Sequence, residues 1–289
     1  MPEPFSDYIG RFAPSPSGPL HIGSLLSAVA SYLDARANSG RWLLRMEDID
    51  PPREQAGASQ TIINSLTLHG LHWDSDVFWQ SQQSSTYNTV LRQLLQNQQA
   101  YYCSCSRSQI NFYGGIHPAE CVYHARAADA AIRFRLEACD IKFQDRLQGE
   151  KIIIAGSIGD PVLRRRDGLF AYQLAVVLDD ASQNISDIVR GADLLDATAW
   201  QIQLQKVLGY KPIRYLHLPV IAGDDGHKLS KQSFAAPIDD SKAKDNLFKV
   251  LRYLNQPPPP AESDIASLLN WACEHWRPQD IPATRTISQ

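Results

Sequence analysis

Two segments far apart in the chain carry residue types suited to phosphate chemistry. The first, residues 11–24, reads Arg-Phe-Ala-Pro-Ser-Pro-Ser-Gly-Pro-Leu-His-Ile-Gly-Ser. Gly23 has no side chain, so a nucleotide can approach the backbone closely there. His21 stands at the start of a predicted helix, where an imidazole can hydrogen-bond a phosphate and the helix dipole favours an anion. Taken alone, a histidine in this position is more often a helix cap or a core residue.

The second segment, residues 228–232, reads Lys-Leu-Ser-Lys-Gln. When ATP activates a carboxylate, the transition state gains negative charge on the α-phosphate, and a lysine on a closing loop can neutralise that charge. We expect Lys231 to do so, assisted by Lys228. Most Lys-x-x-Lys sequences are solvated basic turns, and only the pairing with the first segment favours catalysis here. The predicted ATP site comprises His21, Gly23 and Lys231, with Lys231, His21 and Lys228 as the catalytic residues.

A cysteine cluster suggests a metal site. Cys103-x-Cys105 and His117-x-x-x-Cys121 offer three thiolates and one imidazole, which make a closed tetrahedral zinc set. We therefore predict one structural Zn²⁺ ion. Two alternatives stay open, namely buried free thiols without metal, and Tyr123 or His124 in place of His117 as the fourth ligand.

The elements around the first segment place it in a nucleotide-binding fold. Residues 8–13 read as a strand, residues 21–38 as a helix with an apolar stripe closed by Gly40, and residues 41–46 as a second strand. Strand, loop, helix and strand form the βαβ unit of a doubly wound parallel sheet. The loop lies where such folds bind nucleotides, at the carboxyl end of a strand and the start of a helix.

The rest of the chain divides into an insertion, a return to the α/β pattern and a helical end. We expect helices at 54–69, 84–98 and 196–208, strand-like runs at 131–136, 151–155 and 169–178 with a hairpin turn at Asp167-Gly168, strands at 185–191 and 216–222, and helices after 232 with a break at 257–260. The predicted domains are the first half of a Rossmann-like catalytic domain at 1–100, an inserted zinc-containing α+β subdomain at 101–184, the second catalytic half at 185–232, and a short helical region at 233–289.

Composition narrows the class of protein. The chain has 289 residues, 44% hydrophobic and 20% charged, with a net charge of −3, which argues against non-specific coating of DNA. No apolar run is long enough to span a membrane, and residues 1–7 do not read as a secretory signal. An odd number of cysteines argues against a disulfide framework. We expect a cytoplasmic protein, monomeric, with no membrane or DNA partner.

These motifs support a resemblance to a known family. Residues 21–24 and 228–232 resemble the HIGH and KMSKS signatures of class I aminoacyl-tRNA synthetases. More closely, the chain resembles the glutamyl-tRNA synthetase group through Met-Glu-Asp-Ile-Asp at 46–50, Gly-Leu-Phe-Ala-Tyr-Gln-Leu-Ala at 168–175 and Val-Arg-Gly-Ala-Asp-Leu-Leu at 189–195. The resemblance covers roughly residues 8 to 235. Ser24 in place of the last histidine of HIGH, and the form of the second signature, are typical of the short paralogues in this group.

The resemblance implies the substrates. ATP, bound with Mg²⁺, activates L-glutamate, whose two carboxylates and one ammonium need partners of opposite charge. Arg11 and Arg190 suit the carboxylates, Glu47 suits the ammonium, and Tyr172 can hydrogen-bond a carboxylate. An arginine at 190 favours glutamate over neutral glutamine. The glutamate-binding residues implied are Arg11, Phe12, Ala13, Pro14, Ser15, Glu47, Tyr172 and Arg190.

The short stretch after Gln232 contrasts with the anticodon-reading domain expected of a discriminating glutamyl-tRNA synthetase. The resemblance to the short paralogues implies that tRNA-independent glutamyl-adenylate formation is followed by glutamate transfer to queuosine in the anticodon loop of tRNA(Asp). The alternatives are a truncated synthetase that charges a tRNA 3′ end, a nucleotidylyltransferase acting on a small molecule, and a catalytically silent RNA- or amino-acid-sensing module. The basic run at 164–166 is expected to contact RNA phosphate, although most such runs are solvated surface.

Overall fold

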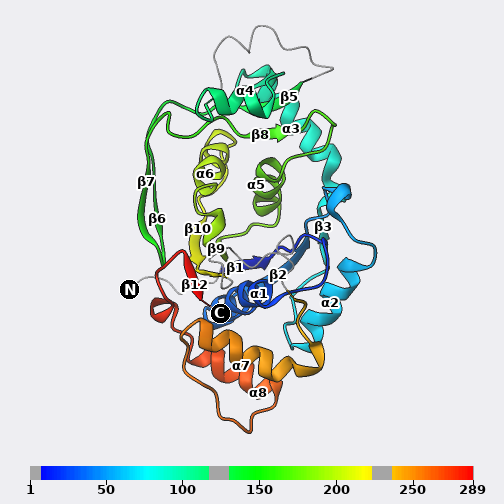
Figure 1. Ribbon diagram of the computed structural model, residues 1–289, viewed down its shortest axis with the longest axis vertical. Helices are drawn as coiled ribbons and strands as arrows, with labels where there is room; N and C mark the ends of the chain where they lie inside the picture. Colours follow the sequence, from blue (N-terminus) through cyan, green and yellow to red (C-terminus); the bar gives the residue numbers. More distant parts are fainter. Residues whose placement is uncertain (1–7, 117–129, 223–235, 289) are drawn as a thin grey trace.

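The computed structural model describes residues 8–116, 130–222 and 236–288 (Figure 1). The molecule is elongated, with a parallel sheet and its helices in the lower half of the view and a second layer of helices and a small sheet above it. Among the helices of these ranges, none has the length and apolar character needed to cross a membrane.

A parallel sheet forms the base of the fold. β1 (Ile9–Phe12), β2 (Arg41–Met46) and β3 (Phe78–Trp79) pair in parallel in that order, and β9 (Asp187–Gly191) pairs in parallel with β10 (Arg214–Leu218). β9 lies beside β1, where the backbone N–H of Ser186 donates to the carbonyl of Ile9 at 3.0 Å. The carboxyl ends of all five strands therefore meet at one edge, which confirms the doubly wound α/β class.

Helix α1 (Ile22–Ala37) connects β1 to β2 and agrees with the predicted helix to within one residue at each end. His21 is its N-cap residue. Leu25, Val29 and Leu33 are fully buried against the sheet, and burial of each such side chain contributes about 1.5–3 kcal/mol. The strand at 41–46 was predicted with the observed bounds of β2.

Helices α7 (Ala243–Tyr253) and α8 (Ile265–Glu274) cover the other side of α1 (Figure 1). The predicted proline break at 257–260 lies between them and separates them into two helices. Leu247, Val250 and Leu268 are fully buried in the same core as α1. The C-terminal helices therefore support the sheet from below.

Two peripheral helices follow β2 and β3. α2 (Ala58–Leu68) begins four residues later than predicted, because a short 3₁₀ turn at 51–53 and Gly57, with φ of 78°, precede it. α3 (Ser84–Gln96) begins at the predicted residue. It leads from the sheet into the upper half of the molecule.

The upper half contains an antiparallel sheet of β4 (Ala100–Cys103), β5 (Ala131–Phe134) and β8 (Val162–Arg164), preceded and followed by helices. α4 (Arg107–Phe112) lies above this sheet in the view, and α5 (Tyr172–Ser182) and α6 (Thr198–Val207) lie between it and the parallel sheet (Figure 1). A second core joins α3, α5 and the antiparallel sheet.

The strand predicted at 169–178 is wrong, because most of that run is the helix α5. The turn at Asp167-Gly168 does form, with a φ of 87° at Gly168, but after one bridge between Arg164 and Phe170 the chain becomes helical. All residues from Leu174 to Asp180 are buried, so the helix has no polar face to reveal its period. A continuous apolar run of this kind cannot be told from a buried strand by its pattern.

Two further pairings link distant parts of the chain. The hairpin of β6 (Ile141–Asp145) and β7 (Gly149–Ile153) docks beside β10, with Asp145 paired to Tyr215. β11 (Val220–Ala222) pairs in parallel with β12 (Thr286–Ser288). The single strand predicted at 216–222 is therefore two strands, separated at Pro219, which has no N–H to donate.

Candidate active site

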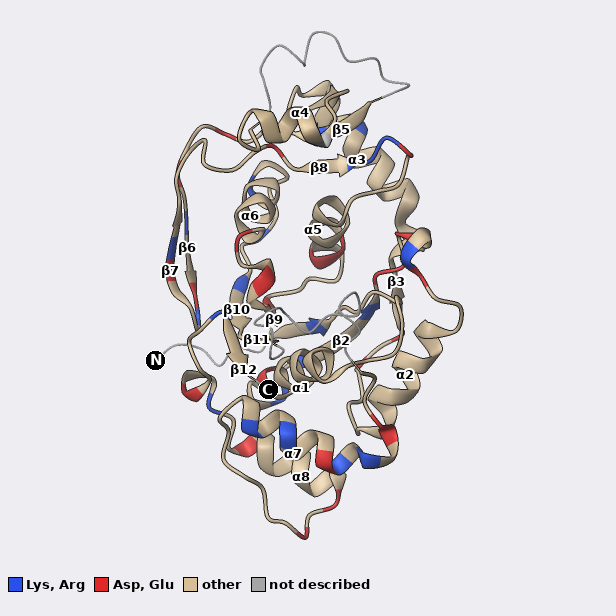
Figure 2. Cartoon of the chain, viewed as in Figure 1, with Lys and Arg blue, Asp and Glu red and all other residues tan. Residues whose placement is uncertain are grey.

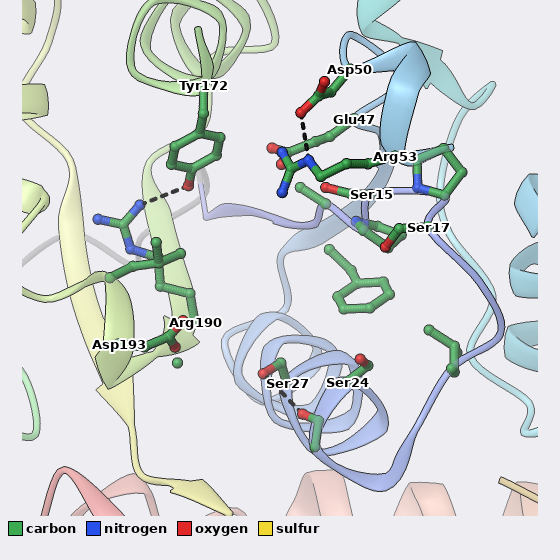
Figure 3. Close-up of a pocket in the computed structure, with 18 of the residues that line it drawn as sticks. Ser15, Ser17, Ser24, Ser27, Glu47, Asp50, Arg53, Tyr172, Arg190 and Asp193 are labelled. Atoms are coloured by element: carbon green, nitrogen blue, oxygen red, sulfur yellow. Dashed lines mark hydrogen bonds and ion pairs between the residues drawn. The ribbon is translucent and has the colours of Figure 1, made fainter. Parts of the chain in front are cut away.

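A cavity of about 680 Å³ opens at the carboxyl edge of the parallel sheet. Figure 3 shows Tyr172 and Arg190 on one side of it and Ser15, Glu47 and Asp50 on the other. Every predicted substrate residue that the structure describes lines this one cavity, namely Arg11, Phe12, Ala13, Pro14, Ser15, His21, Gly23, Glu47, Tyr172 and Arg190. The site thus gathers residues that follow or end β1, β2 and β9, with Tyr172 from the start of α5.

His21 caps α1 at the floor of the cavity. Its Nδ1 accepts from the backbone N–H groups of Gly23 and Ser24 at 3.2 and 3.3 Å, and its Nε2 lies 2.9 Å from the Ser24 hydroxyl. A Cβ at Gly23 would lie 3.1 Å from the ring of His21, so glycine suits this close approach. The capping role considered from the sequence is therefore observed, at a helix N-terminus suited to phosphate.

Arg11 is buried in an ionic network with α5. Its Nε donates to Asp180 Oδ1 at 3.0 Å, and Arg45 on β2 donates to the same oxygen at 2.7 Å. Burial alone would raise the pKa of Asp180, but the charges of Arg11 and Arg45 hold it below its usual value. Figure 2 shows acidic residues on α5 above the sheet. Asp180 thus already supplies one counter-charge to Arg11.

Glu47 follows β2 directly, and its backbone N–H donates to the carbonyl of Pro14 at 3.0 Å. Its Oε1 is buried and makes no hydrogen bond in the described chain; the nearest cation is Arg45, at 3.8 Å. Burial raises the pKa of Glu47 to about 7, against the opposing effect of Arg45 and Arg11. A cationic ligand would give Oε1 the hydrogen-bond donor that the described residues do not provide.

Arg190 on β9 is 5% exposed and has neutral neighbours. Its Nε donates to His217 at 3.0 Å, one terminal nitrogen donates to Thr198 at 2.7 Å, and the other lies 3.4 Å from the Tyr172 hydroxyl. Within the described ranges no carboxylate lies within 4.0 Å of its guanidinium. Burial raises the pKa of Tyr172, so its hydroxyl stays protonated and can donate. This corner of the cavity is suited to an anion.

At the mouth of the cavity, Asp50 forms ion pairs with Arg53 and with Arg165 of the basic run at 164–166. Asp50 accepts from Arg53 at 2.5 Å and from Arg165 at 3.1 Å, and Figure 3 shows the first of these contacts. Arg165 is 44% exposed and also pairs with Asp167. One member of the run at 164–166 therefore lines the cavity entrance, although its RNA contact stays a prediction.

Several predicted residues lie outside the described ranges. These are Lys228, Lys231, His117, Cys121, and the rival zinc ligands Tyr123 and His124. Cys103 ends β4 and is buried, and Cys105 follows it and is partly buried. No group of three or more potential metal ligands occurs in the part of the chain that is described, which holds only these two members of the predicted set.

The sequence did not single out several polar residues that surround the site. Asp180 holds Arg11. The amide of Gln80 donates to Asp179 at 2.6 Å, and its buried Oε1, at the cavity, has no hydrogen-bond partner among the described residues. His217 and Thr198 hold Arg190. His217 could have been noticed, because a histidine in the apolar run Tyr-Leu-His-Leu is unusual for a buried strand.

Comparisons with known proteins agree with this geometry. The model of the family "tRNA synthetases class I (E and Q), catalytic domain" matches residues 9–126 and 115–255. Two relatives, both called Glutamyl-Q tRNA(Asp) synthetase, come from Pseudomonas fluorescens and Pseudomonas aeruginosa. They are 51% and 50% identical, each aligned over 98% of this chain and over 97% and 98% of their own length.

A solved structure shows the same fold. The crystal structure of glutamate-tRNA synthetase from Elizabethkingia anophelis superposes with a TM-score of 0.80 at 21% identity, covering 98% of this chain and 68% of that one. At this identity the likeness concerns the fold alone. The family match and the relatives at 50–51% identity show that the chain belongs to the class I tRNA synthetases of the glutamate and glutamine type, and the cavity at the carboxyl edge of its parallel sheet agrees with this.

Proposed function

We propose that the protein activates L-glutamate with ATP, in the absence of tRNA, and transfers the glutamyl group to queuosine in the anticodon loop of tRNA(Asp). The names of the relatives at 50–51% identity support the acceptor, and the family supports the adenylate. The presence of both His21 and Lys231 in the sequence favours an enzyme over a silent sensing module, and the family match favours a synthetase over a small-molecule nucleotidylyltransferase.

The observation that carries this proposal is the pattern of unpaired charge in the cavity. Among the described residues, the buried guanidinium of Arg190 has no carboxylate within 4.0 Å, and the buried Oε1 of Glu47 accepts no hydrogen bond, although Arg45 lies 3.8 Å away. Buried charges are costly unless a partner compensates them. Glutamate supplies both partners, with its side-chain carboxylate for Arg190 and its ammonium for Glu47. Glutamine would leave Arg190 uncompensated.

In the first step, an oxygen of the glutamate α-carboxylate attacks the α-phosphorus of ATP. The new P–O bond forms as the bond to pyrophosphate breaks. We propose that the phosphates of ATP bind beside His21 and Gly23 at the start of α1, since a helix N-terminus favours anions and these residues line the cavity. We propose that Lys231, assisted by Lys228, neutralises the charge that develops on the α-phosphate.

In the second step, a hydroxyl of the queuosine cyclopentenediol attacks the carbonyl carbon of the adenylate. An ester forms, AMP leaves, and the hydroxyl proton is released. Arg53 and Arg165 at the cavity mouth offer cationic groups to the incoming RNA.

Magnesium fits this site as a companion of ATP. The described residues at the phosphate end, His21, Gly23 and Ser24, present no carboxylate. This suits a Mg²⁺ ion held mainly by phosphate oxygens and water, as is usual for nucleotide sites. The ion would neutralise charge on the phosphates of bound ATP.

We further propose that Cys103, Cys105, His117 and Cys121 hold one structural zinc ion. The donor set is chemically complete for zinc, with four ligands and no position left for water. Cys103 and Cys105 lie at the end of β4, in the upper half of the molecule and away from the strand edge that carries the cavity. The ion would stabilise the part of the proposed insertion at 101–184 that lies around β4, and would take no part in adenylate formation.

The decisive experiment follows radiolabelled glutamate. With ATP and tRNA(Asp) that contains queuosine, label should become linked to the anticodon loop, and tRNA(Asp) without queuosine should stay unlabelled. Glutamate-dependent pyrophosphate–ATP exchange should proceed without RNA, and Arg190→Ala should abolish it. Label in a 3′ ester, or a strict need for tRNA in the exchange, would overturn the proposal.

A further inference from the structure

Arg190 can reach glutamate only through a limited part of its guanidinium. Its Nε is used by His217, and one terminal nitrogen is used by Thr198. The other terminal nitrogen faces Tyr172 at 3.4 Å, at the cavity wall. Figure 3 shows this nitrogen directed to the Tyr172 hydroxyl. The two protein acceptors therefore fix which edge of Arg190 is presented to a ligand.

The proton positions on His217 follow from its neighbours. Asp145 is 1% exposed, its pKa is held below the usual value against burial by the hydrogen bond from His217, and its Oδ2 lies 2.6 Å from His217 Nδ1. An ionised carboxylate can only accept, so Nδ1 carries a proton. A guanidinium can only donate, so Nε2, 3.0 Å from Arg190 Nε, carries a lone pair. His217 is therefore neutral.

Thr198 does not compete for that lone pair. Its hydroxyl proton is directed to the carbonyl of Leu194 at 3.0 Å, which leaves the oxygen free to accept from Arg190. Although Thr198 Oγ1 lies 3.2 Å from His217 Nε2, the hydroxyl proton is directed to Leu194 and Nε2 carries no proton. The imidazole lone pair is thus available to Arg190 alone.

The fold holds this arrangement rigidly. His217 and Arg190 are directly paired residues on the adjacent strands β10 and β9, so their side chains lie on one face of the sheet. Asp145 ends β6, and its Oδ1 accepts from the backbone N–H groups of Leu147 and Gln148 at 3.0 and 2.7 Å. A chain of hydrogen bonds therefore runs from Asp145 through His217 to Arg190, which lines the cavity.

We propose that His217 is a positioning residue for glutamate recognition, whose neutral imidazole accepts from Arg190 and directs the remaining edge of the guanidinium at the substrate side-chain carboxylate. This rests on the proposed function and extends it from Arg190 to the residue that orients it. Neutrality matters, because a second proton on His217 would remove the acceptor and place a like charge beside Arg190.

Two isosteric variants separate this role from a merely structural one. In His217→Gln, the amide oxygen can occupy the place of Nε2 and accept from Arg190, but the bond to Asp145 is lost. In His217→Asn, the amide occupies the place of Nδ1 and keeps Asp145, but Arg190 loses its acceptor. Each variant leaves one bond of the network unmade, so the two are matched controls for stability.

In pyrophosphate–ATP exchange, His217→Asn should raise the KM for glutamate by about tenfold or more, the range for losing a hydrogen bond to a charged group. The KM for ATP should not change, and His217→Gln should stay near the wild type. Equal glutamate KM values in both variants, or a larger rise in His217→Gln, would overturn the inference.

A measurement on the wild-type protein covers the case in which a variant fails to fold. The ¹⁵N spectrum of histidine-labelled protein should show His217 as the neutral Nδ1–H form from pH 6 to 8. A doubly protonated ring or the Nε2–H form would overturn the inference. Because this readout needs no activity, it stays distinct from failure of the proposed function, which would appear as absence of glutamate-dependent exchange in the wild type.

Discussion

Glu47→Gln is expected to make the protein more stable and less active. In the folded protein, burial raises the pKa of Glu47 from 4.5 to about 7. Between pH 4.5 and about 7, Glu47 is protonated in the folded protein but ionised in the unfolded chain. The free energy of unfolding therefore falls as pH rises through this range towards the folded-state pKa of about 7. Above pH 7, the buried negative charge lowers the free energy of unfolding by about 3 kcal/mol. A neutral glutamine at this position avoids that cost.

The same carboxylate should give glutamate binding a characteristic pH dependence. Only ionised Glu47 can pair with the substrate ammonium, so between pH 8 and pH 6 the KM for glutamate should rise by about tenfold for a group with a pKa of about 7. In Glu47→Gln, this dependence should disappear and the KM should be high throughout.

Two assays check this reasoning. Urea unfolding at pH 8 measures the free energy of unfolding of both proteins without substrate, and pyrophosphate–ATP exchange from pH 6 to 8.5 measures the KM for glutamate. Glu47→Asp is the control that keeps the charge. A Glu47→Gln protein that unfolds more easily than the wild type at pH 8, or that keeps the wild-type KM profile, would refute the assignment of Glu47 as a buried ligand of the substrate ammonium.

Three further outcomes are expected. Lys231→Ala should lower kcat for adenylate formation by about 100-fold or more with little change in the KM for ATP, and a pure KM effect would instead indicate ground-state phosphate binding. Cys105→Ser should reduce zinc from about one ion per chain and weaken RNA transfer more than pyrophosphate exchange, whereas metal-free wild type with full transfer activity would exclude the site. Asp180→Asn should lower the free energy of unfolding by about 3–5 kcal/mol, because it leaves Arg11 and Arg45 buried without their carboxylate; unchanged urea unfolding would contradict this.

The sequence predicted best where short-range signals agree. The strand and helix around 9–37 could be placed because the apolar stripe marks the helix and each of its ends has a local signal, His21 at the start and Gly40 just after the end. α5 could not be recognised, because it is buried on every side and carries no polar period. Pro219 divided a predicted strand whose two parts pair with different partners.

The candidate site shows the same division. Motif residues such as Glu47 and Arg190 could be named because they lie in short motifs shared with the glutamyl-tRNA synthetase group, and because their charges suit the ammonium and carboxylate of glutamate. The residues that hold the site in place could not be named from the sequence. Asp180 lies 169 positions from Arg11, and Asp145 lies 72 positions from His217. Such pairings depend on how the sheet and α5 pack, which no local pattern contains.

The pairing of β11 with β12 bears on how the protein is completed during translation. β11 is synthesised before Thr286–Ser288, so until those residues leave the ribosome this edge of β11 lacks its partner strand. β11 also leads directly into the segment that carries Lys228 and Lys231. We therefore expect a nascent chain that lacks β12 to hold glutamate in a formed cavity but to activate it poorly.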